Sequence, residues 1–466
     1  MSDQIENRTF DEIAVGESAC LVRQLTERDI QLFAVMSGDV NPAHVDPEYA
    51  RDARFHEIIG HGMWTGSLIS TVLGTQLPGP GTIYLDQSLH FAGPVRPGDT
   101  VTVTITAREK DPENGIILFD CTCTRQDGKP VVSGTAKVLA PREKVRRKRV
   151  TLPDVALHDR GAKLRRLIDA ARPLGSLAMA VVHPVDTASL TGAVEAAEAG
   201  LIRPILVGPE PRIREAAETA RLDLGGYEIV DAPHSHAAAA KAVDLVRGGE
   251  VQALMKGKLH TDELMGAVVA REGGLRTERR ISHVFVMDVP GYGKPLFITD
   301  AAININPHLA AKADIVRNAI DLARALDVDP PHVALLSAVE TVTDEMASTL
   351  DAAALCKMAD RGQIEGGVLD GPLAFDNAVN AEAARVKGIR SAVAGNAEVL
   401  VAPDLEAGNM LAKQLEYMGD AQAAGIVLGA RVPIALTSRA DDSLSRMASC
   451  AVALRHHAWL RSGSGR

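Results

Sequence analysis

The sequence is poor in cysteine and has no excess of positive charge, and each absence argues against a class of protein. Its five cysteines are scattered through 466 residues, and none has the Cys-x-x-Cys spacing of a zinc or thiol-redox centre. The net charge is −10, whereas a nucleic-acid binder usually needs a basic face to meet phosphates. We therefore expect no nucleic-acid partner, no metal centre and no required redox cofactor.

Long apolar runs are also missing. No segment approaches the length that spans a bilayer, and residues 1–8 lack the apolar core of a signal peptide. Together with the scattered cysteines, these absences predict a cytoplasmic protein with no membrane partner. With 46% hydrophobic residues, the chain is an ordinary globular sequence, long enough for about three domains.

The first 140 residues have the texture of an antiparallel sheet. β-branched residues alternate with polar ones through most of residues 82–139, and turn signals such as Arg96-Pro-Gly-Asp separate the runs. Ahead of them, residues 64–77 are apolar at helical spacing. We predict one α+β domain over residues 1–140, in which strands wrap a single long helix.

Residues 141–154 form a basic run, which we interpret as a solvated linker. The residue pattern changes after it. From 155 to 466, Ala-rich helices alternate with short apolar strands, expected at residues 176–183, 204–207, 251–255, 332–337, 399–402 and 432–437. Two more strands within 281–300 flank a Pro-Gly turn and should be antiparallel. The alternation predicts a mainly parallel α/β sheet covered by helices. We expect two lobes with a cleft between them, one about 155–300 plus 436–466 and the other about 301–435.

A first candidate site lies in the run from Phe33 to His44. A helix beginning near Thr26 should stop at Gly38, which places Asp39 and then His44 on one loop held by Asn41-Pro42. A carboxylate and an imidazole held together can activate water and deliver a proton to carbon, as hydration of a conjugated double bond requires. The N–H of Gly62, at the start of the apolar helix, could bind a thioester oxygen.

This run resembles the hydratase signature of the MaoC-like family, whose members adopt a hot dog fold and include (R)-specific enoyl-CoA hydratases. The resemblance extends through His61-Gly62-Met63 and residues 76–85 to 95–99. It implies that Asp39 and His44 are the catalytic pair, that Gly62 supplies the oxyanion contact, and that the domain forms a homo-oligomer. We place Asn41 and Ser70 with the substrate-binding residues. Ala43 stands where the family usually has a larger aliphatic residue, which leaves the chemical groups in place.

A second candidate site is Thr437-Ser-Arg-Ala-Asp-Asp, between an apolar strand and a helix expected from about 443 to 457. A helix N-terminus offers free N–H groups and partial positive charge to an anion. Arg439 adds a planar, permanently charged fork for phosphate or a developing oxyanion. We predict that Ser438 and Arg439 form an anion site.

Four further polar loops follow strands in the same half of the chain, and with Ser438-Arg439 they resemble the phosphate acetyl/butyryltransferase family across residues 155–466. That family moves an acyl group reversibly between coenzyme A and inorganic phosphate, in a two-lobed Rossmann-like, isocitrate-dehydrogenase-like fold. The resemblance implies that Ser438 and Arg439 hold the phosphate and the thioester carbonyl. Further cleft residues nominated on this basis are Lys256, Thr261, Asp300, Asn304, Asp376 and Asn409.

One position departs from that family. Its members place an aspartate in the helix after the Ser-Arg pair, as a base toward the coenzyme A thiol, and the aligned residue here is Ser445. Asp441 or Asp442 could substitute from the preceding turn. Cys356 lies in an Ala-rich, helix-like stretch, so we favour direct attack of phosphate over a covalent acyl-enzyme.

These inferences predict a bifunctional enzyme that acts on acyl-CoA, enoyl-CoA and phosphate. The first domain would hydrate trans-2-enoyl-CoA to (R)-3-hydroxyacyl-CoA, and the second would interconvert acyl-CoA plus phosphate with acyl phosphate plus coenzyme A. Two alternatives remain at this point. One is a scaffold that binds coenzyme A thioesters and has only one active module. The other is a nicotinamide-dependent decarboxylating dehydrogenase, against which stands the absence of a Gly-x-Gly-x-x-Gly run after a strand.

Overall fold

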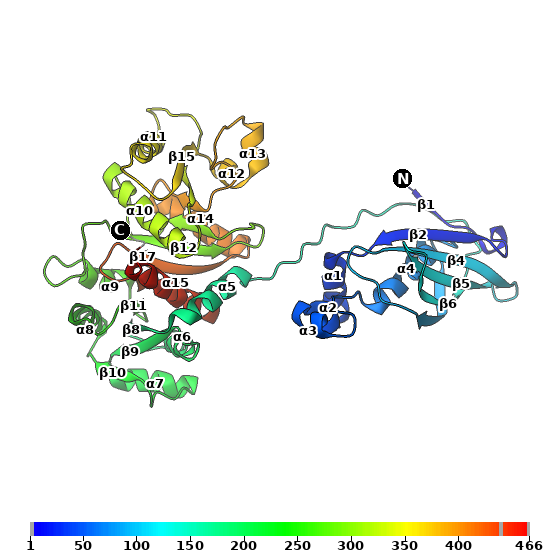
Figure 1. Ribbon diagram of the computed structural model, residues 1–466, viewed down its shortest axis with the longest axis horizontal. Helices are drawn as coiled ribbons and strands as arrows, with labels where there is room; N and C mark the ends of the chain where they lie inside the picture. The colour runs from blue at the N-terminus through cyan, green and yellow to red at the C-terminus, as the bar shows by residue number, and fades with distance from the viewer. Residues whose placement is uncertain (1–3, 438–440, 464–466) are drawn as a thin grey trace. The chain divides into compact units, whose positions relative to one another are not determined.

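The computed structural model of the chain describes residues 4–437 and 441–463 (Figure 1). It has two compact units, Met1–Leu157 and His158–Arg466, so the predicted two-domain architecture is confirmed. Ser438 and Arg439 lie outside the described residues. Within the described ranges, no helix is both long and apolar enough to cross a membrane.

The N-terminal unit is an antiparallel sheet packed on one helix (Figure 1). The strand order is β2-β4-β5-β6-β3, and helix α4 (Gly62–Thr75) buries Ile69, Val72 and Leu73 completely in the core. The prediction of one helix on an antiparallel sheet is therefore confirmed. The strands are β2 (Ser18–Gln24), β3 (Ile83–Phe91), β4 (Thr100–Asp111), β5 (Ile116–Arg125) and β6 (Pro130–Leu139). β2 lies ahead of the segment in which strands were predicted.

Three short helices precede α4 and carry the first candidate site. α1 (Glu27–Ser37) starts at a capping box on Thr26 and ends at Gly38, whose φ of 74° is left-handed, as predicted. α2 (Pro42–Val45) and α3 (Pro47–Asp52) follow directly. His44 was expected on a loop but lies in α2. Asn41 as cap and Pro42 at the first helical position start that helical turn.

The basic run at 141–154 is not wholly a linker. β7 (Arg146–Lys148) pairs antiparallel with β1 (Gln4–Glu6) at the start of the chain. Glu6 lies 3.1 Å from Lys144 and 2.8 Å from Arg146, so an acidic residue distant in sequence offsets the positive charge of the run. Regular structure is absent over residues 140–145 and 149–161 of this junction.

Among its described residues, the C-terminal unit is built on one sheet of eleven strands, in the order β10-β9-β8-β11-β18-β17-β12-β13-β16-β14-β15. Seven of its ten neighbouring pairs are parallel, which confirms the predicted mainly parallel sheet. The strands are β8 (Leu177–Val182), β9 (Ile202–Gly208), β10 (Glu228–Asp231), β11 (Ala253–Lys256), β12 (Ser282–Asp288), β13 (Leu296–Thr299), β14 (His332–Leu336), β15 (Val368–Leu373), β16 (Val399–Val401), β17 (Gln422–Leu428) and β18 (Ile434–Ala435).

Helices cover both faces of this sheet, and alternate residues of β8 point into two different cores. Met179 and Val181 join a core with α5, α6 and α15, whereas Ala180 and Val182 join one with α8 and α9. The helices are α5 (Ala162–Ala171), α6 (Thr187–Glu198), α7 (Glu210–Ala220), α8 (Ser235–Gly248), α9 (Thr261–Val268), α10 (Leu309–Ala325), α11 (Ala347–Asp360), α12 (Phe375–Val379), α13 (Ala381–Val386), α14 (Leu405–Met418) and α15 (Ser443–Arg461).

The predicted lobe boundaries need one correction. β12 and β13 form the expected antiparallel pair. β17, however, lies between β18 and β12, although the sequence order assigned it to the lobe at 301–435. The chain therefore returns to the first part of the sheet before residue 436, where β17 pairs antiparallel with both of its neighbours.

A buried histidine in β12 predicts acid sensitivity of the C-terminal unit. His283 is fully buried, and both of its ring nitrogens lack a hydrogen-bond partner among the residues that the structure describes. Burial, with a smaller contribution from Lys413, lowers the pKa of His283 from 6.5 to about 3. Below pH 6.5, His283 therefore binds a proton in the unfolded chain, whereas in the folded chain it stays neutral down to about pH 3. For this proton alone, the free energy of unfolding should fall by about 1.4 kcal/mol per pH unit in that window.

Replacing His283 by leucine should remove this contribution and flatten the pH dependence. Trp459 lies in the C-terminal unit and Trp64 in the N-terminal unit, so a Trp64→Phe background isolates the C-terminal emission signal. Urea unfolding at pH 7.5, 6 and 5 would compare His283→Leu with the exposed control His260→Leu. The same pH dependence in both variants would contradict the assignment.

Candidate functional sites

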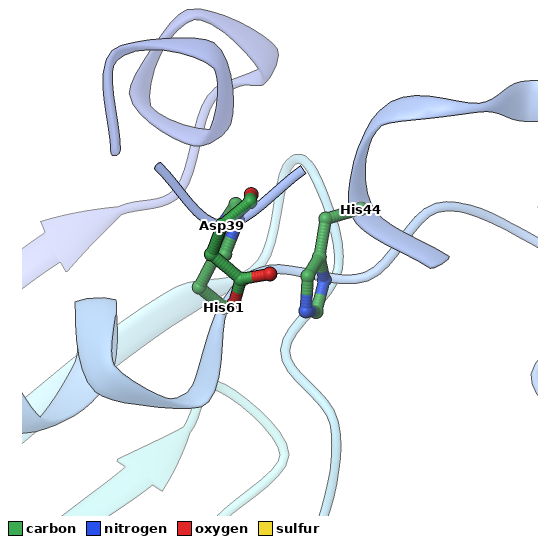
Figure 2. Close-up of side chains that lie close together, drawn as sticks. All are labelled: Asp39, His44 and His61. Atoms are coloured by element: carbon green, nitrogen blue, oxygen red, sulfur yellow. Dashed lines mark hydrogen bonds between the residues drawn. The ribbon is translucent and has the colours of Figure 1, made fainter. Parts of the chain in front are cut away.

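Asp39 and His44 come together where α1 gives way to α2. The Asp39 carboxylate accepts a hydrogen bond from the Asn41 N–H at 3.2 Å, which turns the chain into the helix that carries His44. Figure 2 shows this carboxylate facing the His44 ring. Asp39 is exposed and His44 is half-buried, so the pair is accessible from solvent.

The hydrogen bond of His44 defines which ring nitrogen can act as a base. Its Nδ1 lies 2.8 Å from the carbonyl oxygen of Ile59. A carbonyl oxygen only accepts, so Nδ1 carries the proton of the neutral ring and Nε2 keeps its lone pair. Nε2 is therefore the nitrogen that can take a proton from water.

His61 is part of this site, although it was not nominated from the sequence. Its side chain is 2% exposed, and its Nε2 lies 3.0 Å from the backbone oxygen of Asp39. Its ring centroid is 4.0 Å from that of His44 and 5.0 Å from that of Phe33. His61 thus fixes the backbone of Asp39 and packs against His44. Its position directly before Gly62 was the only sequence signal for this role.

A pocket of about 380 Å³ opens beside the pair, and both His44 and Gly62 line it. Gly62 is the first residue of α4, where the helix leaves N–H groups without intrahelical partners. The other lining residues are mostly apolar and are Arg54, Phe55, Ile59, Gly60, Thr65, Phe91, Ala92, Gly93, Pro94, Val95 and Val132. An acyl chain could lie in this pocket with its carbonyl near the Gly62 N–H.

Asn41 and Ser70, the two predicted substrate-binding residues of this unit, do not line the pocket. The Asn41 side-chain oxygen accepts a hydrogen bond from the Ala43 N–H at 3.1 Å, so it serves as the cap of α2. Ser70 is exposed on α4 and is not among the residues that line the pocket. The structure therefore does not bring Asn41 or Ser70 to the place where Gly62 meets the pocket.

In the C-terminal unit, two buried cations meet at Thr437, the residue before Ser438. Lys256, at the end of β11, is 6% exposed and places its Nζ 3.5 Å from the Thr437 carbonyl oxygen. Arg446, from α15, is 4% exposed and donates to the Thr437 hydroxyl at 3.1 Å. Positive charge therefore gathers directly beside the predicted anion site, and Arg446 is a residue that the sequence interpretation missed.

The two aspartates that could replace the family's helix aspartate lie directly ahead of α15. Asp442 is the cap of α15, and its carboxylate accepts hydrogen bonds from the Ser445 N–H and from Gln422, each at 2.8 Å. One of its oxygens therefore caps the helix, and the other accepts from a side chain of β17. Asp441 lies one residue further out, and its backbone oxygen accepts from Arg446 at 3.3 Å.

Three other nominated residues lie in or contact the segment that follows β13. Asp300 is 3% exposed and accepts from the N–H groups of Ala302 and Ile303 and from the Asn304 amide, which is 2.6 Å away. Burial raises the pKa of Asp300. Asn409, in α14, donates to the Ala301 carbonyl at 3.0 Å. These contacts build one polar cluster from Asp300, Asn304 and Asn409.

Asp376 and Thr261 are placed differently. Asp376 is exposed in α12 and pairs with Lys387 at 3.0 Å, which holds the pKa of its carboxyl below the ordinary value. Asp376 was predicted to be a cleft residue, but in this structure it forms an ion pair on the surface. Thr261 is the first residue of α9, shortly after β11.

Burial raises the pKa of the Cys356 thiol to about 12, so this cysteine is protonated at neutral pH.

Comparison with known proteins identifies both parts of the chain. Residues 234–454 match the family model described as "Phosphate acetyl/butaryl transferase", and residues 16–123 match the "MaoC like domain". The phosphate acetyltransferase of Rhizobium meliloti is 65% identical over 301 residues, which are 65% of this chain and 95% of that protein. The chain belongs to the phosphate acetyl/butyryltransferase family. It carries a MaoC-like domain in its N-terminal unit.

Solved structures similar to this family member fall into two groups. A branched-chain phosphotransacylase from Enterococcus faecalis V583 is 29% identical, covers 60% of this chain and 99% of that chain, and has a TM-score of 0.54. An (R)-hydratase from Pseudomonas aeruginosa, solved without ligand, is 43% identical, covers 33% of this chain and 99% of that chain, and has a TM-score of 0.32.

The two matched segments enclose the candidate sites of this phosphate acetyl/butyryltransferase family member. The segment at 234–454 contains Lys256, the Asp300 cluster and Thr437 with the Ser-Arg pair that follows it. The segment at 16–123 contains Asp39, His44 and Gly62. Each site can therefore be considered with the family to which its own segment belongs.

Proposed function

We propose that the chain is bifunctional, with a phosphate acyltransferase in the C-terminal unit and an enoyl-CoA hydratase in the N-terminal unit. The observation that carries the transferase is the 65% identity to a phosphate acetyltransferase over 95% of that protein's length. The observation that carries the hydratase is the pairing of Asp39 with His44, which lines a pocket together with Gly62.

In the hydratase, His44 Nε2 and the Asp39 carboxylate act on one water molecule. The water oxygen bonds to carbon 3 of trans-2-enoyl-CoA while the pair takes one water proton and delivers a proton to carbon 2. Charge that develops on the thioester oxygen is stabilised by the N–H of Gly62. The product is (R)-3-hydroxyacyl-CoA, the handedness expected for a MaoC-like hydratase.

In the transferase, a phosphate oxygen attacks the thioester carbonyl, and the bond to sulfur breaks as coenzyme A leaves with a proton. Ser438 and Arg439 hold the phosphate and the carbonyl oxygen, and the buried charges of Lys256 and Arg446 strengthen the attraction for the anion. Asp441 or Asp442, directly ahead of α15, would act as the base toward the thiol. The protonated thiol of Cys356 favours direct attack by phosphate.

The transferase is tested by phosphate-dependent release of free thiol from a panel of acyl-CoAs. We propose acetyl-CoA as the first substrate, because the 65% identical relative is an acetyltransferase, with butyryl- and branched-chain acyl-CoAs as the alternatives to compare. Formation of acyl phosphate in step with the thiol identifies the reaction. Thiol release at the same rate without phosphate would contradict it.

The hydratase is tested by the loss of enoyl-CoA absorbance and by chiral analysis of the product. Running both assays on one preparation also separates a bifunctional enzyme from a scaffold with one active module. Equal amounts of (R)- and (S)-3-hydroxyacyl-CoA, or no product, would contradict the hydratase assignment.

Gly62→Ala should lower kcat/KM for hydration by about 10- to 100-fold, because a methyl group there displaces groups at the reacting carbonyl. A Cβ on Gly62 would lie 3.0 Å from the Phe91 ring, which lines the same pocket. Gly74→Ala is the matched control, because a Cβ at Gly74 in the same helix meets nothing within 4 Å. Equal hydration rates in the two variants would show that hydration does not need the open space at Gly62.

Three earlier expectations remain proposals. They are a cytoplasmic location, a homo-oligomer formed through the hot dog domain, and a Rossmann-like, isocitrate-dehydrogenase-like arrangement of the C-terminal lobes. Sedimentation of the full chain tests the second, with a monomer at micromolar concentration as the opposing result.

A further inference from the structure

One nitrogen of His61 has no use in the hydration mechanism. Because His61 Nε2 lies against a carbonyl oxygen, it carries the ring proton, and Nδ1 keeps a lone pair. This Nδ1 is buried and has no hydrogen-bond partner within the described part of the chain. An acceptor withdrawn from water without a partner costs free energy, so a bound group that uses the lone pair would stabilise the site.

The surroundings of His61 supply two more electron-pair donors. One ring nitrogen of His44, one of His61 and one carboxylate oxygen of Asp39 all lie within 4.8 Å of one another (Figure 2). Two imidazole nitrogens and a carboxylate oxygen form a ligand set that suits Zn²⁺. In each neutral ring one nitrogen keeps its lone pair, and binding through that nitrogen requires no loss of a proton.

The outer hydrogen bonds of the two rings also have the form found at metal centres. His44 donates from Nδ1 to the oxygen of Ile59, and His61 donates from Nε2 to the oxygen of Asp39. A metal-bound histidine usually donates its other N–H to a carbonyl or carboxylate, which fixes the ring orientation and tautomer. Both rings are thus held before any ion arrives.

We propose that Asp39, His44 and His61 bind Zn²⁺, and that the ion reversibly switches off the N-terminal module. The inhibition rests on the proposed hydratase function, whereas the binding does not. Zn²⁺ bound to His44 and Asp39 takes the lone pair and the carboxylate that hydration requires. The acyltransferase module shares none of these residues, so the ion inhibits hydration and leaves acyl transfer by the same chain unchanged.

Binding is tested first, on the full chain without substrate. Equilibrium dialysis against buffered Zn²⁺ should give wild type one zinc equivalent that His61→Gln binds at least about 10- to 100-fold more weakly, the loss typical of removing even an outer-shell partner. Asp39→Asn should lose the same equivalent, and because Asp39 is exposed this variant keeps the fold. His90→Gln, an exposed histidine of the same unit, is the matched control. Equal zinc affinity in His61→Gln and His90→Gln would overturn the proposal.

The activity test uses the ratio of each variant's rate with zinc to its own rate without zinc. Zinc at the wild-type dissociation constant should halve wild-type hydration, leave the His61→Gln ratio near one, and leave acyl transfer unchanged in both. Binding that leaves wild-type hydration intact would overturn the switch. Absence of hydration in zinc-free wild type would instead contradict the hydratase function and leave the dialysis result standing.

Discussion

Asp39→Asn is expected to lower kcat for enoyl-CoA hydration by about 10²- to 10⁴-fold, the usual contribution of a positioned acid/base group. The amide keeps the shape of the side chain and its hydrogen bond to the Asn41 N–H, but it cannot take a proton from water. Because Asp39 is exposed and its backbone oxygen still accepts from His61, the loop should keep its conformation. The loss should therefore be a loss of chemistry rather than of folding.

Acyl transfer measured on the same Asp39→Asn preparation supplies an internal control, and it should match wild type. Asp52→Asn, at the exposed end of α3, is the control for a change of charge in the same unit. The measurement is the initial loss of enoyl-CoA absorbance at saturating substrate. Hydration at the wild-type rate in Asp39→Asn would assign the reaction to other residues.

Arg439→Ala is expected to lower acyl transfer by about 10²- to 10³-fold, as the removal of one donor to a developing oxyanion does. The reason lies in the residues on either side. Thr437 is held between the buried Lys256 and Arg446, and α15 presents its N-terminus after Asp442. Arg439 stands between Thr437 and Asp442 in the sequence, and in the proposed mechanism its charge adds to that of Lys256 and Arg446 in attracting the anion.

Arg431→Ala is the matched control for this experiment, because Arg431 is exposed just ahead of β18. Arg439→Lys keeps the charge but loses the bidentate fork, so its rate should fall between those of wild type and alanine. Phosphate-dependent thiol release is the measurement, and hydration by the same preparation should not change. Equal rates in Arg439→Ala and Arg431→Ala would exclude Arg439 from the site.

The parts of the fold that were predicted correctly rest on local patterns. Alternation in β4 and β5 and the caps of α1 can be identified from neighbouring residues alone. β2 was missed because most of its residues are exposed, which weakens the apolar alternation. β7 was missed because its basic residues are stabilised by Glu6, a partner at the other end of the unit.

The site residues that were missed depend on contacts between distant segments. His61 acts through the backbone oxygen of Asp39, and a backbone partner leaves no trace in the sequence pattern. Arg446 can be buried because Gly192 leaves room for it, since a Cβ there would lie 2.6 Å from the Arg446 side chain. Asp376, which was nominated, pairs with Lys387, the residue directly after α13. None of these relations follows from spacing along the chain.

The pairing of β1 with β7 has a consequence for how such a chain can arise. It brings the first and last strands of the N-terminal unit side by side, so the polypeptide enters and leaves that unit at one place. A domain whose ends meet can be joined to another protein through a single segment without interrupting its sheet. The N-terminal unit thus has its own hydrophobic core and adjacent ends. Gene fusion could add such a unit to an existing transferase without altering the hydrophobic core of either.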